Sequence, residues 1–374
     1  MHLPIECIEI LGVEIPLSEP FRISKAEIRT QKSAVVRITA GGVVGLGNVD
    51  PTPGYSLYSV EAILASLERR VGPSVLGRNA MNIHDLLARM DAVQPGLEDA
   101  KAAIEMACVD IASRAMGIPV HTWLGGAVKD RLLFNGWIGI DPPDVAARKT
   151  AALQRAGYCS AKIKVGKGIE ADRDRIRAVR EACGPDFRIR MDANCGYDAD
   201  TSIRLARSVA GFGIELYEQP VPEHDIEGMA RVRREGAGVP VMADESVVDT
   251  ASLIRIIRAE AADIVKFKVM KQGGFLRTIR LVATAEAAGM RCVVGHGFGL
   301  GVNTMAEIML CAACPNVLDG IECVGPLKTT DDIVVAKLDL SAGALALPPG
   351  PGLGVTLDDA KVARYRSSRV ELRS

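Results

Sequence analysis

Seven polar or ionisable residues recur along the chain at a nearly constant step. They are Lys164, Asp192, Glu218, Asp244, Lys268, His296 and Glu322. Successive members lie 24 to 28 residues apart, and each one ends or follows an apolar, strand-like run. A step of about 25–30 residues accommodates one strand, one helix and their loops. The pattern therefore predicts side chains at the carboxyl ends of successive parallel strands, where a βα barrel has its active site.

Three carboxylates, those of Asp192, Glu218 and Asp244, are consecutive members of this series. Neighbouring strands lie about 4.8 Å apart, so the three groups can converge on one point. Three carboxylates at such short distances repel one another, so they need a bound cation or must be protonated. Oxygen-only ligation favours Mg²⁺, with Mn²⁺ as the alternative ion. A single acid at a barrel rim would more often form a loop salt bridge, but three in consecutive units favour a metal site.

Two pairs of lysines flank the carboxylates. Lys162 and Lys164 are two residues apart and share one face of a strand, and Lys266 and Lys268 repeat this arrangement one strand beyond Asp244. Charges that point into a barrel are unfavourable unless they are paired, and the carboxylates provide partners. A nearby cation and a second ammonium would lower a lysine pKa towards neutrality. One inward lysine alone could be a salt-bridge partner, whereas Lys164 and Lys268 together predict an acid/base pair, with one lysine on each face of a substrate.

The elements that must position these groups follow from hydrophobic periodicity. We expect strands at 161–165, 187–191, 214–217, 239–243, 264–269, 292–295 and 317–321. Helices are expected between them, at 172–182, 199–210, 249–259 and 278–288. Asp249 begins a capping sequence, and Gly289 is a typical residue at a helix end.

The flanking regions have different patterns. Residues 1–55 predict a β meander with a turn at Gly41–Gly42, and 59–116 predict helices, which together give an α+β domain. The stretch 326–374 is rich in Pro and Gly, cannot continue the repeat and is expected to return to the first domain. The predicted domains are therefore 1–125, 126–325 and 326–374.

Length and composition disfavour several classes of protein. A chain of 374 residues suggests a large barrel with a smaller domain, and a net charge of −1 favours neither nucleic acid nor an anionic membrane as partner. No apolar run is long enough for a transmembrane helix, and the N-terminus has no signal-peptide pattern. Nine scattered cysteines indicate a reducing compartment, so we expect a cytoplasmic protein. Cys311 and Cys314 form a C-x-x-C, but within a predicted helix, where buried packing is the favoured interpretation.

Five motifs together resemble the enolase superfamily. They are K-I-K at 162–164, M-D-A-N at 191–194, Y-E-Q-P at 217–220, A-D-E-S at 243–246 and K-x-x-K-Q-G-G at 268–274. More narrowly, they are similar to the muconate lactonizing enzyme subgroup of the mandelate racemase/muconate lactonizing enzyme family, over nearly the whole chain. The resemblance implies an α/β fold, a (β/α)₇β modified TIM barrel with an N-terminal α+β capping domain, and a homo-oligomer.

The same resemblance implies site roles. Asp192, Glu218 and Asp244 would bind Mg²⁺, and Lys164 and Lys268 would be the acid/base catalysts. The shared chemistry is abstraction of the proton α to a substrate carboxylate, giving a metal-stabilised enediolate.

Four further residues are expected to orient ligands or substrate: Lys162, Asn194, Glu245 and Lys266. Lys266 departs from the family, where an uncharged polar residue is commoner. It either lowers the pKa of Lys268 or forms a salt bridge with Asp244 or Glu245.

Substrate contacts are expected from the capping-domain loops and the last strand ends. The candidates are Phe21, Arg22, Ser24, Tyr55, His296, Phe298 and Glu322. Arg22 could pair with a substrate anion or face solvent, and His296 could be satisfied by its neighbours. Glu322 lies in I-E-C-V-G-P, which resembles E-L-F-G-P of muconate cycloisomerases. Val324 departs from the D-x-D of dipeptide epimerases, although Glu322 could still bind one cationic group.

The sequence thus predicts an isomerase, either a racemase/epimerase or a cycloisomerase, whose partner is a small carboxylate or amino-acid derivative. A dehydratase of acid sugars or hydroxyproline-type substrates is the alternative on the same site. More remote alternatives are a Schiff-base aldolase that uses Lys164 or Lys268, and a non-catalytic barrel.

Overall fold

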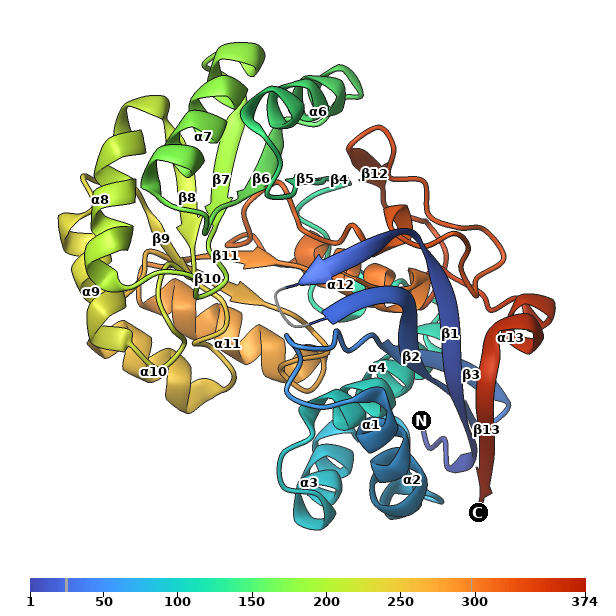
Figure 1. Ribbon diagram of the computed structural model, residues 1–374. Helices are drawn as coiled ribbons and strands as arrows, with labels where there is room; N and C mark the ends of the chain where they lie inside the picture. The colour runs from blue at the N-terminus through green and yellow to red at the C-terminus, as the bar shows by residue number, and fades with distance from the viewer. Residues whose placement is uncertain (24–25, 297) are drawn as a thin grey trace.

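The computed structural model describes residues 1–23, 26–296 and 298–374. It has two adjoining parts: an antiparallel sheet with helices packed beside it, and a curled parallel sheet surrounded by helices (Figure 1). Within the described residues, no helix is long and apolar enough to cross a membrane.

The antiparallel part confirms the predicted meander. Its strands are β1 (Ile5–Ile23), β2 (Ala26–Ala40) and β3 (Val43–Val49), with β2 and β3 joined by the expected turn. Gly41 and Gly42 have φ of +55° and +77°, a conformation that glycine adopts without strain.

Helices follow, as predicted for 59–116. They are α1 (Val60–Ser66), a π-helical turn (Leu67–Val71), α2 (Gly72–Val75), α3 (Ile83–Val93), α4 (Glu98–Ala115) and α5 (Val120–Trp123). The central helix α4 is buried along nearly all its length and packs on β3.

Glycines allow this close packing. A Cβ atom on Gly45 would lie 2.2 Å from the carbonyl oxygen of Ala107, and one on Gly47 would lie 1.8 Å from that of Ala103. Both acceptors are backbone atoms of α4, so neither can move without moving the helix. The two glycines are two residues apart on one face of β3 and thereby set the distance between sheet and helix.

We predict that Gly47→Ala destabilises the fold by about 3 kcal/mol, because the added methyl overlaps rigid backbone. The midpoint of urea unfolding measures this. Gly211→Ala is the matched control, because a Cβ there meets nothing within 4 Å, and its effect should stay within about 0.5 kcal/mol. Equal midpoints for both variants would contradict the packing argument.

The parallel sheet, as described, has the order β11-β10-β9-β8-β7-β6-β5. Its strands are β5 (Gly136–Ile138), β6 (Ser160–Lys164), β7 (Arg188–Asp192), β8 (Ile214–Glu218), β9 (Val241–Ala243), β10 (Ile264–Phe267) and β11 (Arg291–Val294). The helices that cover it are α6 (Pro143–Arg155), α7 (Ile169–Cys183), α8 (Ala199–Val209), α9 (Ile226–Glu235), α10 (Thr250–Arg258), α11 (Phe275–Ala287) and α12 (Gly301–Ala313).

Most predicted strands are confirmed, and the last one differs. The segment 317–321 forms isolated bridges in place of a full strand: Val317 pairs with Cys292 of β11, and Ile321 pairs with Phe134 just before β5. These bridges join the two edges of the sheet and close the barrel. Asp249 caps α10 as expected, since its carboxylate accepts a hydrogen bond of 2.8 Å from the Ser252 amide.

The C-terminal stretch returns to the first sheet. It contains a 3₁₀ turn (Gly325–Leu327), β12 (Ala344–Ala346), α13 (Asp359–Tyr365) and β13 (Arg366–Arg373). Strand β12 pairs with β4 (Arg131–Leu133), and β13 pairs antiparallel with β1. The expected return is therefore present, while the domain boundaries at 125/126 and 325/326 stay predictions. Cys311 and Cys314 are buried at the end of α12.

The barrel interior is layered. Leu216, Met242, Ile264 and Val293 form an apolar cluster inside it, with Leu318 packed against them. Side chains along a strand alternate between its two faces. The residue two positions after each member of this cluster therefore also points into the barrel. After Leu216, Met242 and Ile264 these residues are Glu218, Asp244 and Lys266, so the apolar layer forms the floor beneath them.

Candidate active site

The three predicted metal ligands lie at neighbouring strand ends. Asp192 on β7 and Glu218 on β8 are paired in register, and Asp244 directly follows β9. Each residue is only 1% exposed. The structure therefore brings the three carboxylates into one buried row, which is the arrangement that their spacing predicts.

Two lysines lie between the carboxylates. The Nζ atom of Lys162 is 3.2 Å from Asp192 Oδ2 and 2.9 Å from Glu218 Oε2. The Nζ atom of Lys266 is 2.9 Å from Glu218 Oε1 and 3.7 Å from Asp244 Oδ2. Lys266 thus forms the expected contact with Asp244, but its shorter ion pair is with Glu218.

Glu322 belongs to the same network. Its Oε2 accepts hydrogen bonds of 2.5 Å from both Lys162 and Lys266, and Arg190 lies 3.5 Å from its Oε1. These charges overcome the effect of burial and hold the pKa of the Glu322 carboxyl well below its usual range. The expectation that Glu322 binds a cationic substrate group is therefore disfavoured, because its charge is already compensated inside the barrel.

The two predicted acid/base lysines lie at opposite ends of the carboxylate row. Lys164 Nζ is 2.7 Å from Asp192 Oδ2, and Lys268 Nζ is 2.6 Å from Asp244 Oδ1. Glu218 lies between these two carboxylates in the strand order. A ligand bound at the row would therefore have one lysine on each side.

Two groups in or beside the carboxylate row, Glu218 and Lys268, have shifted pKa values. Burial, reinforced by the adjacent Asp192 carboxylate, raises the pKa of Glu218 to about 8. Burial also lowers the pKa of the Lys268 ammonium to about 8, opposed by Asp244 and assisted by the charge of Lys266. The predicted effect of Lys266 on Lys268 is thus present together with its ion pairs.

Residues beside the row fix the orientation of its members. The Asn194 amide donates a 2.9 Å hydrogen bond to Asp192 Oδ1, and its side-chain nitrogen donates one of 3.1 Å to Glu245 Oε1. The oxygen of the Asn194 side chain accepts a hydrogen bond from Lys164. Asn194 therefore links a candidate ligand, a candidate catalyst and Glu245.

Gln219 and Lys271 are positioning residues that the sequence interpretation did not single out. The Gln219 Oε1 accepts hydrogen bonds from the backbone amides of Asp244 (3.0 Å) and Ser246 (3.2 Å). Lys271 Nζ donates to the Asp244 carbonyl oxygen at 2.8 Å. Both residues lie in quoted motifs, Y-E-Q-P and K-x-x-K-Q-G-G, so motif membership was the available signal.

The capping part contributes Tyr55. Its hydroxyl donates to both carboxylate oxygens of Asp244 at 2.8 Å and accepts a hydrogen bond from Lys268. Tyr55 was predicted as a substrate contact, and the structure connects it to a candidate ligand and a candidate catalyst.

Other predicted substrate contacts have different outcomes. Ser24 lies outside the described residues. Phe21 and Arg22 lie on β1, where their backbones pair with Ile28 and Glu27, and their side chains are outside the description.

His296 and Phe298 follow β11 and are buried. Burial and the charges of Lys268 and Lys328 lower the pKa of His296 to about 3, so its imidazole is neutral. Neither ring nitrogen has a side-chain hydrogen-bond partner among the described residues. The Phe298 ring contacts Lys328, a residue that the sequence interpretation missed.

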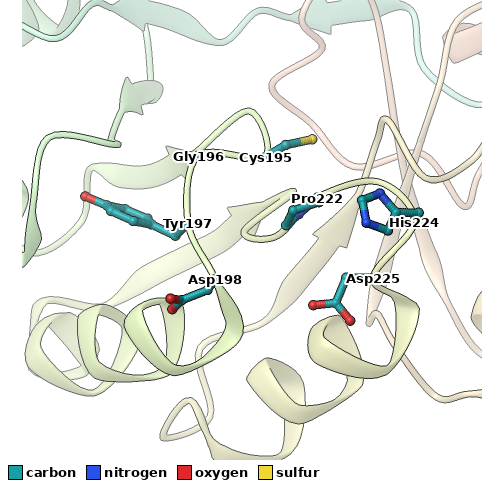
Figure 2. Close-up of a pocket in the computed structure, with 7 residues that line it drawn as sticks. All are labelled: Cys195, Gly196, Tyr197, Asp198, Pro222, His224 and Asp225. Carbon is teal, nitrogen blue, oxygen red and sulfur yellow. The ribbon is translucent and has the colours of Figure 1, made fainter.

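A separate pocket of about 450 Å³ lies between the loops that follow β7 and β8 (Figure 2). It is lined by Cys195, Gly196, Tyr197, Asp198, Pro222, His224 and Asp225. Asp198 and Asp225 cap α8 and α9, through hydrogen bonds of 2.7 Å and 2.8 Å to backbone amides. These carboxylates are therefore engaged in holding helix ends, and the pocket lacks the lysine–carboxylate row.

The donor set of the row fits a hard divalent cation. It consists of carboxylate oxygens that are buried, adjacent and like-charged, a combination that a cation stabilises. Within residues 1–23, 26–296 and 298–374, no three carboxylate, imidazole or thiol groups already surround a common point, since lysine ammonium groups lie between the acids. Asp192, Glu218 and Asp244 would hold the ion, in exchange for the contacts that these ammonium groups make.

Comparison with known proteins identifies the family of the chain. Residues 7–125 match the family model "Mandelate racemase / muconate lactonizing enzyme, N-terminal domain", and residues 144–361 match "Enolase C-terminal domain-like". The chain belongs to the mandelate racemase/muconate lactonizing enzyme family.

Relatives of known activity cover nearly the whole chain. An N-succinyl-L-Arg/Lys racemase of Bacillus cereus is 33% identical over 359 residues, which cover 96% of each chain. A solved structure of an N-succinyl Arg/Lys racemase from Bacillus cereus has a TM-score of 0.94 at 31% identity, and the match covers 99% of this chain and 100% of that one. A chloromuconate cycloisomerase of Cupriavidus necator is 30% identical over 97% of this chain and 99% of its own. A dipeptide epimerase of Enterococcus faecalis, solved in complex with Mg and a dipeptide, has a TM-score of 0.89 over 95% of this chain and 100% of that one, at 30% identity.

These findings confirm three predictions. The family is the one that the five motifs indicate, and the fold is its α/β barrel with a capping domain. The relatives are racemases, epimerases and cycloisomerases, so the predicted isomerase of the mandelate racemase/muconate lactonizing enzyme family is confirmed as well.

In this family member, we predict that Tyr55→Phe lowers the rate of α-proton exchange about tenfold to a hundredfold, because charged groups lose a hydrogen-bond partner. The rate of deuterium uptake at the α-carbon of a substrate, followed by NMR in D₂O, measures this effect. Tyr58→Phe changes the same loop and is the control, with an expected change of less than about twofold. An unchanged exchange rate in Tyr55→Phe would contradict a role of the Tyr55 hydroxyl in positioning Lys268 and Asp244.

Proposed function

We propose that the chain is a Mg²⁺-dependent isomerase that removes and returns the proton α to the carboxylate of a small substrate. The observation that carries the proposal is the placement of Lys164 and Lys268 at opposite ends of a buried row of three carboxylates. The relatives named above act as racemases, epimerases or cycloisomerases, which supports the isomerase class.

In this proposal, Asp192, Glu218 and Asp244 bind the ion and thereby fix the position of the substrate carboxylate between the lysines. Mg²⁺, when bound, would stabilise the negative charge that develops on that carboxylate as the proton leaves. The chain's own contribution is proton transfer: one lysine Nζ takes the α-proton, and the other can deliver a proton to the opposite face.

Neighbouring residues keep the lysines in place. Asn194 holds Lys164 beside Asp192, and Tyr55 holds Lys268 beside Asp244. Beneath them, Lys162 donates hydrogen bonds to Glu218 and Glu322, and Lys266 donates one to Glu218, so these ammonium groups compensate part of the carboxylate charge. The lowered pKa of Lys268 makes its neutral, basic form accessible near neutral pH.

A screen of carboxylate and amino-acid derivatives in D₂O tests the function. With Mg²⁺ present, α-deuterium uptake should appear in at least one compound class, and it should disappear after EDTA treatment and return on adding Mg²⁺. Full exchange in metal-free protein would contradict the metal role. A dehydrated product with no isomer would move the assignment to a lyase. The cytoplasmic location and the homo-oligomeric state stay predictions.

A further inference from the structure

Helix α12 contains one carboxylic acid in a buried, mostly apolar stretch. Every residue from Gly301 to Ala312 is buried, and Glu307 in the middle of this stretch is 0% exposed. Burying a polar group is unfavourable unless the group forms hydrogen bonds. The contacts of Glu307 therefore show what this residue contributes to the structure.

Glu307 contacts the segment 268–274, which begins with Lys268 and is called the Lys268 segment below. Its Oε1 accepts a hydrogen bond of 2.8 Å from the amide of Val269, the residue directly after Lys268. Its Oε2 has no hydrogen-bond partner among the described residues. Burial raises the pKa of Glu307 to about 8, so the carboxyl is mainly uncharged at neutral pH. Glu307 thus acts on this segment as a hydrogen-bond acceptor for one backbone amide.

The same side of α12 contacts a further residue of the Lys268 segment. Asn303 lies four residues before Glu307 and therefore on the same helix face. Its side-chain nitrogen lies 3.4 Å from Met270 Sδ and donates a hydrogen bond of 2.9 Å to Asp50 Oδ2. The Asp50 amide also donates to Met270 Sδ, at 3.4 Å. Helix α12 thereby ties the Lys268 segment to the capping part.

The Lys268 segment is a turn with its own internal hydrogen bonds. Strand β10 ends at Phe267, so the parallel ladder does not include Lys268. Within the turn, Gln272 Oε1 accepts a 2.7 Å hydrogen bond from the Lys268 amide, and the Gln272 amide donates one of 3.1 Å to the Lys268 carbonyl. These bonds fix the shape of the turn, whereas its place on the barrel depends on contacts with other elements. The hydrogen bond from Val269 to Glu307 is such a contact, one residue from Lys268.

We propose that Glu307 is a positioning residue for the reaction: by holding the Val269 amide, it fixes the point from which the Lys268 side chain reaches the substrate. The inference rests on the proposed function, since that function assigns proton transfer to Lys268. If the amide loses its acceptor, the turn can shift and carry Lys268 with it, while Lys164 on the opposite side stays in place. A displacement of about 1 Å at a reacting group can lower the rate by about a hundredfold.

Deuterium uptake into each pure enantiomer of a substrate tests this role. Glu307→Leu removes the acceptor and should slow exchange about tenfold to a hundredfold for the enantiomer that depends on Lys268, while the rate for the other enantiomer changes less than about threefold. Glu307→Gln keeps the shape and an acceptor oxygen, so both rates should stay within about threefold of the wild type. Glu307→Asp keeps the carboxyl but is one methylene shorter, so it should give the same split between enantiomers and replaces Glu307→Leu if that variant does not fold.

Thr304→Val is the matched control on the same helix. Thr304 is 0% exposed, and its hydroxyl has no hydrogen-bond partner among the residues that the structure describes. Both exchange rates should therefore stay within about threefold of the wild type. Equal losses for both enantiomers in Glu307→Leu would indicate a merely structural role and overturn the inference. Unchanged rates in Glu307→Leu, or a loss of the same size in Glu307→Gln, would overturn it as well.

Backbone amide exchange separates this inference from the proposed function. Mass spectrometry of the peptide that covers the Lys268 segment should show faster exchange at Val269 in Glu307→Leu than in the wild type and in Glu307→Gln. Identical amide exchange in the three proteins would overturn the inference. If the wild type takes up no α-deuterium in any substrate while the difference at Val269 is present, the proposed function is contradicted and the anchoring of the Lys268 segment by Glu307 is supported.

Discussion

Replacing Lys164 by Ala should stop α-proton exchange from one enantiomer of the substrate far more than from the other, and replacing Lys268 by Ala should show the reverse. We expect a loss of about 10²–10⁴ for the enantiomer that each lysine deprotonates. The reason is geometric: a base must lie within hydrogen-bond reach of the proton it takes, and these lysines lie at opposite ends of the carboxylate row.

Deuterium uptake into each pure enantiomer in D₂O, followed by NMR, measures the difference between the two exchange rates in each variant. Lys149→Ala, an exposed lysine on α6, is the control and should exchange both enantiomers at the wild-type rate. Equal losses for both enantiomers in both variants would contradict the racemase and epimerase assignment. A loss of rate in one variant, without any change in which enantiomer exchanges, would instead fit a cycloisomerase or dehydratase with a single base.

Glu218→Gln is the second change with a large expected effect. Glu218 is the middle member of the row, and the substitution removes its negative charge while keeping its shape. Activity should fall by about a thousandfold or more, because the carboxylate cannot be replaced as a ligand by a neutral amide and the substrate charge loses its stabilisation.

Two measurements separate this effect from misfolding. Titration with Mn²⁺, read by electron paramagnetic resonance, should show weaker metal binding in Glu218→Gln, whereas its circular dichroism spectrum should match the wild type. Glu227→Gln on the exposed face of α9 is the matched control and should bind the ion normally. Wild-type metal affinity in Glu218→Gln would exclude this residue from the ligand set.

The predicted site residues were accessible from sequence because their period is that of the barrel itself. One ionisable residue at each strand end gives a step that a single sequence displays, and the structure brings Asp192, Glu218 and Asp244 into a row as this step requires. The strand–helix alternation and the N-terminal meander were predictable for the same reason, since both depend on local periodicity.

Residues outside the period were missed. Strand β5 has three residues, Gly136–Ile138, which is too short for a periodic signal, so Trp137 was not recognised. Lys328 lies in the Pro- and Gly-containing stretch after the barrel and has no regular spacing from the other lysines. Its ammonium group contacts the rings of Trp137 and Phe298, which come from distant segments, so only the folded chain brings these three residues together.

The role of Glu322 was predictable in part. Its position at the rim follows from the period, but its partners depend on how the barrel closes. Closure places the segment 317–321 beside β11 and next to Phe134, and this brings Glu322 to Lys162 and Lys266. A sequence cannot display that register, because the pairing is between the two ends of the sheet.

The pairing of β13 with β1 affects how the protein is made. Strand β1 is synthesised before the barrel, and its neighbour β13 is synthesised after it. During translation, one edge of β1 therefore stays exposed, and the N-terminal sheet can be completed only after β13 emerges. The two chain ends finish close together, since the Ser374 amide donates a 3.1 Å hydrogen bond to the Glu6 carbonyl. A circular permutant that joins these ends would produce β13 and β1 consecutively, and its nascent chain could protect that edge from the start of synthesis.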